Sequence, residues 1–255
     1  MRTWTPHRLV VLVLVAVILT SVGVWWATRD ALPDRLIIAT AHETGLYHKL
    51  AGAIEERYEA RTGKDLELRA TRGSWENVDL LDAGEVDLAI LQGTALEEVG
   101  RTNVAVLAAL HPEVVHVVVR SNSAAGDVLD LPGSAVSIGE PGSGMRESAG
   151  VLLRHYRIRN EELARNEAPF EELATDPTLE GAIVTTGLDN PGLCRLLDSG
   201  EFRLLPLGDA AAIALSRPTF EVFEIPRGFY DERPALPPQP VTTVATTAVL
   251  VARLD

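Results

Sequence analysis

The spacing of hydrophobic positions in this chain changes repeatedly between that of a strand and that of a helix. Short β-branched runs are followed by segments in which apolar residues recur every three or four positions, and the two kinds alternate from about residue 35 onward. Strands that alternate with helices in this way are typical of an α/β fold with mostly parallel strands. We therefore expect an α/β fold.

Four segments share one design, which is a short strand, a loop of small residues and the start of a helix. In chain order they are RLIIAT-AHETG-LYHKLAGAIEERYEARTG, LELRAT-RG-SWENVDLLDAG, AVSIG-EPGSG-MRESAGVLLRHY and GAIVTT-GLDNPG-LCRLLDSG. Ligands of open α/β sheets bind beyond the carboxyl ends of the strands, where helix N-termini present free N–H groups. A single loop of this kind can equally be a simple turn with a capping residue, but four of them favour a ligand-binding cleft.

Two further apolar runs, Val86–Gln92 and Glu113–Arg120, are predicted to be buried strands. The second is followed by the turn-rich SNSAAGDVLDLPG, a suitable crossing between two lobes. A late Pro-rich stretch leads into VTTVATTAVLVARL, which is expected to cross back. This places lobe 1 at residues 31–120, lobe 2 at 121–225 and a return segment at 226–255.

The N-terminus has a different pattern. Residues 9–27 contain no charge, and a helix of that length spans about 28 Å, close to the hydrocarbon thickness of a bilayer. Trp25 and Trp26 stand where an aromatic belt belongs. Residues 1–30 are therefore expected to tether an exported protein to the cytoplasmic membrane. Cleavage is the alternative, because Ser21-Val22-Gly23 has the small-x-small form of a signal peptidase site, and would leave the protein soluble in the periplasm.

Charge and cysteine content narrow the function classes. The formal net charge is −13 and no cluster of Lys and Arg is present, so nucleic acid is not expected as a partner. The single cysteine, Cys194, excludes an intrachain disulfide, and no Cys/His spacing suggests zinc. A small anionic ligand stays compatible with this charge, because helix N-termini and single arginines make a pocket locally positive. No cofactor is expected.

The loop EPGSG and the residues ahead of the second helix suit a polar ligand. Gly142 and Gly144 permit close ligand approach, and Ser143 adds a hydroxyl beside the positive end of a helix. Arg72 precedes a helix start, where a guanidinium opposes the helix dipole unless an anion offsets it. It either binds a ligand carboxylate or pairs with Glu76. Ser74 is expected to cap the helix that follows.

The sequence supports a metal site or a catalytic site less well than a ligand-binding site. His42 and His48 are six residues apart with a glycine between them, which is not the i, i+4 spacing of zincins, so no metal is expected. Ser143 has Pro141 and Met145 where a nucleophile elbow requires glycine. We expect no enzymatic activity, and an enzyme on the same scaffold ranks behind a binding protein.

Five blocks follow the order and spacing of the TAXI family of solute-binding proteins, which serve TRAP transporters. They are IATAHETGLYHKLAGAI, ATRGSWENVDLLDAGEVDLAILQ, LAALHPEVVHVVVRSNS, AVSIGEPGSGMRESAGVLL and AIVTTGLDNPGLCRLLDSGEFRLLPL. The resemblance covers about residues 35–255. It implies a two-lobed periplasmic-binding-protein-like fold (type II) with hinge strands, which closes around a small solute and delivers it to multi-pass TRAP permease subunits driven by an ion gradient.

The chain departs from that family at several places. Its first loop is AHETG where family members have a glycine-rich segment, and Arg72 stands where they carry a glycine. Family members also continue beyond the strand that resembles TTAVLVARL, so the segment 226–255 is expected to be incomplete. Tyr47 falls where the family has a cleft tyrosine, and it either contacts the solute or packs in the buried face of its helix.

These considerations give one set of candidate ligand-binding residues with neutral polar, aromatic or cationic groups. The set is Thr44, Gly45, Tyr47, Arg72, Gly73, Ser74, Trp75, Asn77, Gln92, Gly142, Ser143, Gly144, Thr185, Thr186 and Asn190. The expected function is an extracytoplasmic receptor that captures a small carboxylate-bearing solute, such as glutamate or a dicarboxylate, for a TRAP-type transporter. The alternative is a membrane-anchored ligand sensor with no transport role.

Overall fold

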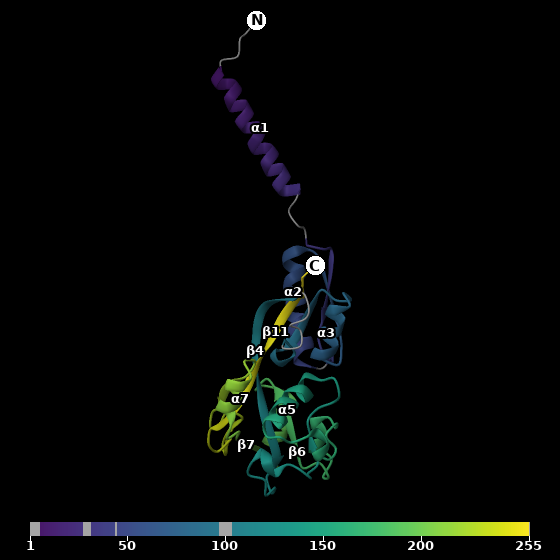
Figure 1. Ribbon diagram of the computed structural model, residues 1–255, viewed down its shortest axis with the longest axis vertical. Helices are drawn as coiled ribbons and strands as arrows, with labels where there is room; N and C mark the ends of the chain where they lie inside the picture. Colours follow the sequence, from purple (N-terminus) through teal and green to yellow (C-terminus); the bar gives the residue numbers. More distant parts are fainter. Residues whose placement is uncertain (1–5, 28–31, 44, 97–103, 255) are drawn as a thin grey trace. The chain divides into compact units, whose positions relative to one another are not determined.

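The computed structural model describes residues 6–27, 32–43, 45–96 and 104–254 (Figure 1). The chain divides into two units, Met1–Asp34 and Arg35–Asp255.

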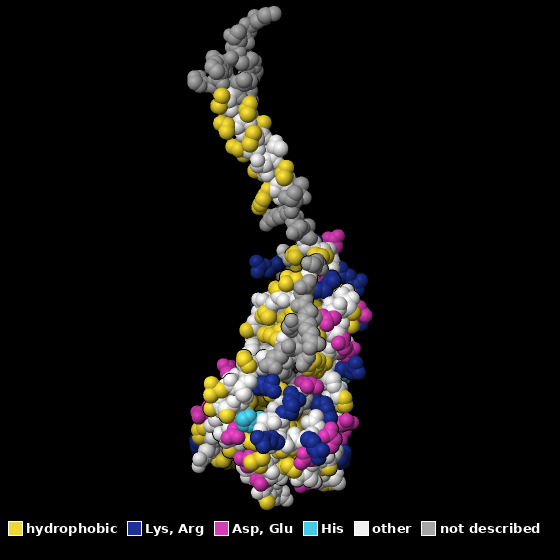
Figure 2. All heavy atoms as spheres, in the orientation of Figure 1, with side chains coloured by type: hydrophobic (Ala, Val, Ile, Leu, Met, Phe, Trp, Pro, Cys, Tyr) yellow, Lys and Arg dark blue, Asp and Glu magenta, His cyan; other side chains and the backbone are white. Residues whose placement is uncertain are grey.

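The first unit contains helix α1 (Pro6–Ala27), which exposes apolar side chains around its circumference. Consecutive residues Val13, Leu14 and Val15 are all exposed, and Figure 2 shows hydrophobic side chains along the surface of this helix. Among the side chains of α1, those at 6–9, 12, 26 and 27 lie outside the described part of the chain. Within the described part, no helix has the combination of length and apolar character that crossing a membrane requires.

The second unit is built on one mixed sheet of nine described strands. The order is β2-β1-β3-β11-β4-β6-β5, with β7 paired to β4 and β8 paired to β11. The strands are β1 (Arg35–Ala39), β2 (Asp65–Arg69), β3 (Leu88–Gln92), β4 (Val104–Arg120), β5 (Val136–Ser137), β6 (Gly181–Thr186), β7 (Phe202–Leu205), β8 (Glu221–Ile225) and β11 (Val241–Arg253). A separate hairpin joins β9 (Asp231–Glu232) to β10 (Ala235–Leu236).

The four expected strand–loop–helix units are present as β1–α2, β2–α3, β5–α5 and β6–α6. The helices are α2 (Leu46–Thr62), α3 (Ser74–Asp82), α5 (Gly144–His155), α6 (Pro191–Asp198) and α7 (Ala210–Ser216). Short 3₁₀ turns are η1 (Gly93–Ala95), η2 (Val128–Asp130), η3 (Asn160–Glu162) and η4 (Phe170–Ala174). Helix α2 ends as expected at Gly63, whose left-handed φ of 66° lets its N–H reach the carbonyl of Glu59 at 2.9 Å.

The expectation of a mostly parallel sheet is wrong. Parallel pairing is found for β1–β2, β1–β3 and β5–β6. Strand β11 is antiparallel to β3, β4 and β8, and β4 is antiparallel to β6 and β7. The two long strands β4 and β11 therefore insert an antiparallel pair into the middle of the sheet.

We call β1 to β3 with α2 and α3 lobe 1, and β5 to β7 with α5 and α6 lobe 2. Strands β4 and β11 belong to both and run side by side between them (Figure 1). Strand β4 pairs with β11 along Val104–Val114 and with β6 from Val114 onward. Since these two strands are shared, the predicted domain limits stay predictions.

Alternate residues of the inner strands pack against opposite helices, which gives each lobe three layers. Ile38 of β1 lies in the cluster with α2, whereas its neighbour Ala39 lies in the cluster with α3. In lobe 2, Ile183 of β6 packs with α5 and Val184 packs with α6. The two-residue period of the strands thus places helices on both faces of the sheet in each lobe.

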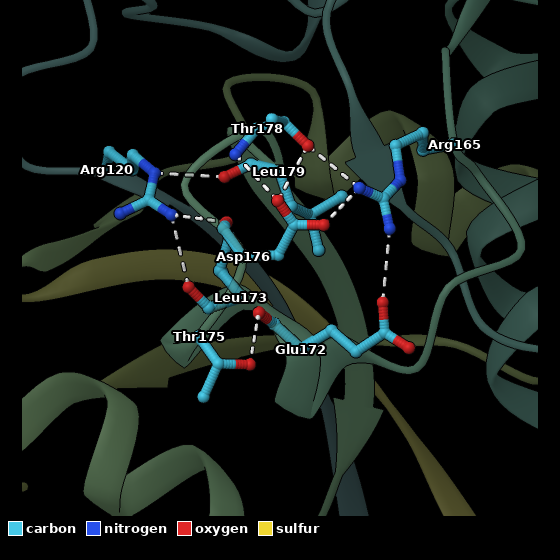
Figure 3. A network of polar contacts seen from close by, with 8 residues as sticks. All are labelled: Arg120, Arg165, Glu172, Leu173, Thr175, Asp176, Thr178 and Leu179. Atoms are coloured by element: carbon cyan, nitrogen blue, oxygen red, sulfur yellow. Dashed lines mark hydrogen bonds and ion pairs between the residues drawn. The ribbon is translucent and has the colours of Figure 1, made fainter.

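Arg120, the last residue of β4, holds the loop between η4 and β6 in place. Its Nε donates to the carbonyl oxygen of Leu179 at 2.9 Å, and its Nη2 donates to those of Leu173 at 3.2 Å and Asp176 at 2.8 Å (Figure 3). On the opposite side, Arg165 pairs with the carboxylate of Asp176. The Nε and Nη2 groups of Arg120 are thus bonded to backbone carbonyls of η4 and of the loop that follows it.

Replacing Arg120 with Met is expected to lower the free energy of unfolding by about 2 kcal/mol, because three carbonyls lose a charged donor. Urea unfolding followed by circular dichroism measures the change. The matched control is Arg159→Met, since Arg159 has a side chain 79% exposed and pairs with Glu162 at the surface; it should change stability by less than about 0.5 kcal/mol. Equal effects of the two substitutions would contradict the role of Arg120.

Candidate functional site

A cavity of about 170 Å³ lies where residues of lobe 1 meet residues of lobe 2. Its walls come from all four strand–helix junctions, from the end of β3 and from the middle of β4. The lining residues are Ala41, Leu46, Tyr47, Arg72, Gly73, Ser74, Gln92, Glu113, Gly144, Met145, Thr185, Thr186 and Asn190. We call this space the inner cavity.

The inner cavity brings together nine of the predicted ligand-binding residues, which come from positions far apart in the chain. They are Tyr47, Arg72, Gly73, Ser74, Gln92, Gly144, Thr185, Thr186 and Asn190. Gly45 lines an adjoining space of about 480 Å³, the outer cavity, which shares Leu46 and Asn190 with the inner one. Thr44 lies outside the described residues. That these residues contact a ligand stays a prediction.

Asn77 and Trp75 do not line the inner cavity. The Asn77 side chain is buried, and its Nδ2 donates to the carbonyls of Thr40 at 2.6 Å and Ile90 at 2.9 Å, while its Oδ1 accepts from the Thr71 hydroxyl. All of its polar atoms are used to join β1, β3 and α3. The indole N–H of Trp75 is buried and has no hydrogen-bond partner among the described residues.

Ser143 and Gly142 also stay outside the lining. Ser143 caps α5, because its Oγ accepts from the backbone N–H of Arg146 at 3.2 Å and donates to the carbonyl of Glu140 at 2.8 Å. Gly142 is exposed and has a φ of 84°. The structure therefore assigns the EPGSG serine to helix capping, the plainer of its two interpretations.

The expectation that Ser74 caps α3 is wrong. The N-cap is Gly73, whose φ of 127° is available to glycine and turns the chain so that Ser74 becomes the first helical residue. The Ser74 Oγ instead accepts from the backbone N–H of Gln92 at 2.9 Å. Ser74 thereby connects the start of α3 to the end of β3.

Gly73 and Gly144 allow the N-termini of α3 and α5 to meet across the two lobes. A Cβ on Gly144 would lie 2.8 Å from Gln92 Oε1 and 3.2 Å from Ser74 Oγ. A Cβ on Gly73 would lie 3.9 Å from the backbone N of Gly144. A side chain at position 144 would therefore require the Gln92 and Ser74 side chains to move.

Arg72 lines the inner cavity, but its guanidinium is already paired. Its Nε donates to Glu76 Oε2 at 3.0 Å and its backbone N–H donates to the same oxygen at 2.8 Å. These bonds lower the pKa of Glu76. The Arg72 side chain is 78% exposed, so the surface ion pair that the sequence left open is the one formed.

The polar groups from lobe 2 are ordered by each other. The Thr185 Oγ1 accepts from the Ser148 hydroxyl at 2.6 Å. Asn190 caps α6 through its Oδ1, and its Nδ2 donates to the Thr186 Oγ1 at 3.0 Å. These hydrogen bonds hold neutral donors and acceptors in place along one wall of the inner cavity.

Glu113 is a lining residue that sequence reasoning missed. It is 5% exposed, and the Tyr47 hydroxyl donates to its Oε2 at 2.9 Å. Burial raises the pKa of Glu113 to about 7, against hydrogen bonds from Tyr47 and Gln92 that lower it. Burial and the adjacent Glu113 raise the pKa of Tyr47 well above its ordinary value. Tyr47 is therefore both packed in lobe 1 and placed at the cavity.

Only one basic group approaches Glu113 among the described residues. The Nε2 of His111 is 3.9 Å from Glu113 Oε1, both ring nitrogens of His111 are buried without hydrogen-bond partners, and burial lowers its pKa. His111 is thus neutral at pH 7 and does not offset a charge on Glu113. The signal for Glu113 in the sequence was one acidic residue at the start of an apolar strand.

Metal binding has no support in the described part of the chain. No group of three or more His, Cys, Asp or Glu side chains is placed there to hold a metal ion. His48 Nδ1 instead lies 3.1 Å from the hydroxyl of Thr40.

Glu113 should make the stability of the ligand-free protein depend on pH. Its pKa is about 7 when folded and about 4.5 when unfolded, so the folded state binds more protons in that interval and the free energy of unfolding falls as pH rises through it. Glu113→Gln should therefore be more stable than the wild type by up to about 3 kcal/mol at pH 8, and by at most about 1 kcal/mol at pH 5. Urea unfolding at both pH values measures this, and a difference independent of pH would refute it.

Solved structures similar to this chain are binding proteins and regulatory domains. The alkanesulfonate-binding protein SsuA from Xanthomonas axonopodis pv. citri, bound to MOPS, has 14% identity and a TM-score of 0.55 over 88% of this chain and 67% of that one. PhnD1 from Prochlorococcus marinus (MIT 9301), in complex with methylphosphonate, has 12% identity and a TM-score of 0.57 over 88% and 78%. The CcmR regulatory domain from Synechocystis PCC6803, in complex with 2-PG, has 14% identity and a TM-score of 0.51 over 87% and 88%.

These similarities establish the fold, which is an α/β two-lobed fold of the periplasmic-binding-protein type with a mixed sheet. The chain spans about two thirds of the length of the sulfonate-binding proteins, with 66% of SsuA from Escherichia coli covered. The narrower resemblance to the TAXI family stays a prediction. At the level of sequence, residues 38–255 match the NMT1-like family, and because this match covers most of the chain, the protein belongs to the NMT1-like family.

Proposed function

We propose that this protein is an extracytoplasmic solute-binding receptor that captures a small carboxylate-bearing solute, such as glutamate or a dicarboxylate, for a TRAP-type transporter. The observation that carries the proposal is the convergence of four helix N-termini, those of α2, α3, α5 and α6, on one cavity between two lobes. Each N-terminus carries partial positive charge. Helix N-termini also present N–H groups without intrahelical partners, although at α6 those of Gly192 and Leu193 are bonded to the Asn190 side chain. Together they offer an anion a favourable site in a chain of net charge −13.

The inner cavity also has the mixed lining expected of a small-molecule site. Ala41, Leu46 and Met145 contribute apolar surface, and Thr185 and Thr186 contribute hydroxyls in positions held by hydrogen bonds. The similar structures support a binding role, since SsuA is an alkanesulfonate-binding protein and PhnD1 was solved with methylphosphonate. No catalytic step is part of the proposal.

Signalling of solute capture to the permease would use the two shared strands. Only β4 and β11 run through both lobes among the described strands, so a change in their curvature alters the angle between the lobes. Closure brings the N-termini of α3 and α5 together, and the contact between Gly73 and Gly144 forms part of that closed arrangement. The permease subunits then recognise the closed form.

Charge reversal at Arg72 should weaken carboxylate binding. Arg72→Glu places a negative charge at the cavity edge, and we expect a three- to tenfold weaker affinity, because the side chain is largely exposed and its field is screened. Isothermal titration with glutamate, glutarate and succinate measures this. The control is Arg57→Glu, an exposed position on α2 outside the cavity lining, which should leave affinity within twofold. No binding of any of these acids to the wild type would remove the carboxylate claim.

A ligand sensor without a transport role is the second candidate. The similarity to the CcmR regulatory domain, which covers 88% of that domain, favours it. A neighbouring gene for a multi-pass permease would support transport, whereas a neighbouring gene for a histidine kinase would support sensing.

We also propose that residues 9–27 tether the receptor to the cytoplasmic membrane, as the uncharged run and the paired tryptophans suggest. The full chain should then sediment with membranes and resist extraction by alkaline carbonate. Val15→Arg combined with Ile18→Arg places two charges in the run, at a cost of about 3 kcal/mol each for insertion, and should release the protein. A wild-type chain found entirely in the soluble periplasmic fraction would indicate the cleaved alternative.

A further inference from the structure

We propose that Glu113 binds a cationic amine of the solute, so that the receptor takes zwitterionic amino acids in preference to simple carboxylic acids. This inference rests on the proposed function, because it assigns the second charged group of a solute whose carboxylate lies at the helix N-termini. It adds to the site a residue that neither the sequence pattern nor the family match pointed to.

The hydrogen bonds that Glu113 receives within the protein leave part of its acceptor capacity unused. Its carboxylate receives one hydrogen bond from the Tyr47 hydroxyl, at 2.9 Å, and a second from the side chain of Gln92. A carboxylate offers about four acceptor positions on its two oxygens. Both donors are neutral, so the side chain that lines the cavity retains acceptor capacity and a full charge when ionised.

Glu113 has no Lys or Arg as a counter-charge among the described residues. The titratable and charged groups around Glu113 are Tyr47 on α2, His111 on β4 and Arg72 ahead of α3. His111 is neutral at pH 7, and Arg72 is paired with Glu76, so within the described residues no Lys or Arg forms an ion pair with Glu113. A buried carboxylate without a partner is costly. An ammonium group in the inner cavity would supply the partner.

The outer cavity adjoins the inner cavity at Leu46 and Asn190. Three of its lining side chains, Glu140, Glu171 and Asp189, are acidic, whereas two, Lys49 and His42, are basic. The pKa of Glu171 is raised mainly by burial and to a smaller extent by the charge of Glu140, whereas Arg195 lowers it. This surface attracts the cationic end of a solute, while the helix N-termini attract its carboxylate.

The test compares amino acids with the same acids lacking the amine. Isothermal titration at pH 8 uses three matched pairs: glutamate and glutarate, aspartate and succinate, and leucine and 4-methylpentanoate. At least one amino acid should bind the wild type ten or more times tighter than its deaminated partner. Glu113→Gln should weaken the affinity for that amino acid at least tenfold and change the affinity for the deaminated acid less than threefold. Glu56→Gln, which removes an exposed charge of α2 outside the cavity lining, is the control and should change neither.

A second measurement separates an ionised Glu113 that accepts from an amine from a neutral Glu113 that donates to a carboxylate. In the first case the wild-type affinity for the amino acid rises between pH 5 and pH 8, and in Glu113→Gln it is flat over the same range. In the second case it falls as pH rises, and that result overturns the inference. Glu113→Asp keeps the negative charge and should keep part of the preference for the amine. If Glu113→Gln melts at a much lower temperature than the wild type, the affinities of Glu113→Asp for the same pairs are used instead, and loss of the whole preference in that variant overturns the inference.

The failures of the two proposals are distinguishable. If the deaminated acids bind as tightly as the amino acids, or if Glu113→Gln weakens both members of a pair equally, the inference about the amine is wrong and the receptor for carboxylates stands. If no member of any pair binds the wild type, both proposals are overturned.

Discussion

The contact between the N-termini of α3 and α5 is the constraint on which the site depends. A Cβ on Gly144 would lie 2.8 Å from Gln92 Oε1 and 3.2 Å from Ser74 Oγ, so any side chain there would require these two side chains to move. Because Gly144 belongs to lobe 2 and the other two residues to lobe 1, this contact is where the two lobes approach each other at the inner cavity. It also brings two positive helix ends together, which is unfavourable unless negative charge lies nearby. On the proposed function, a bound anion would offset this repulsion and so help to hold the lobes closed.

Glu113 stands where the two halves of the sheet join. Its neighbour Val114 pairs with Ala245 of β11 on one side and with Thr186 of β6 on the other, so β4 changes partner at this position. A change in the angle between the lobes has to pass through this point, and Thr186 lines the same cavity. A solute that engages Glu113 is thus attached to the place where the sheet bends, and this gives a physical route from occupancy to lobe movement.

The parts of the fold that depend on local pattern were predictable, whereas those that depend on distant partners were not. The strand–loop–helix units follow from hydrophobic periods within a few residues, and so does the strand that ends at Gln92. The antiparallel pairing of β4 with β11 joins segments more than a hundred residues apart. Nothing in the sequence of either segment indicates the direction in which it runs relative to its partner. Ser74 looked like a cap because its true partner, the N–H of Gln92, lies on another strand. Glu113 could not be assigned to the site from the sequence, since its burial follows from how lobe 1 packs around it.

Strand β4 contains two charged side chains that differ in how their polar atoms are bonded. Arg120 is partly buried, and Glu113 is buried. Arg120 donates through its Nε and Nη2 groups to three backbone carbonyl oxygens. Glu113, seven positions earlier in the same strand, receives only neutral donors, and its neighbour His111 is itself without hydrogen bonds. A charge whose partners are complete contributes to folding, whereas a charge left incomplete beside a cavity lowers stability unless something binds there. The contrast between Arg120 and Glu113 within one strand is therefore consistent with the proposed binding of an amine at Glu113.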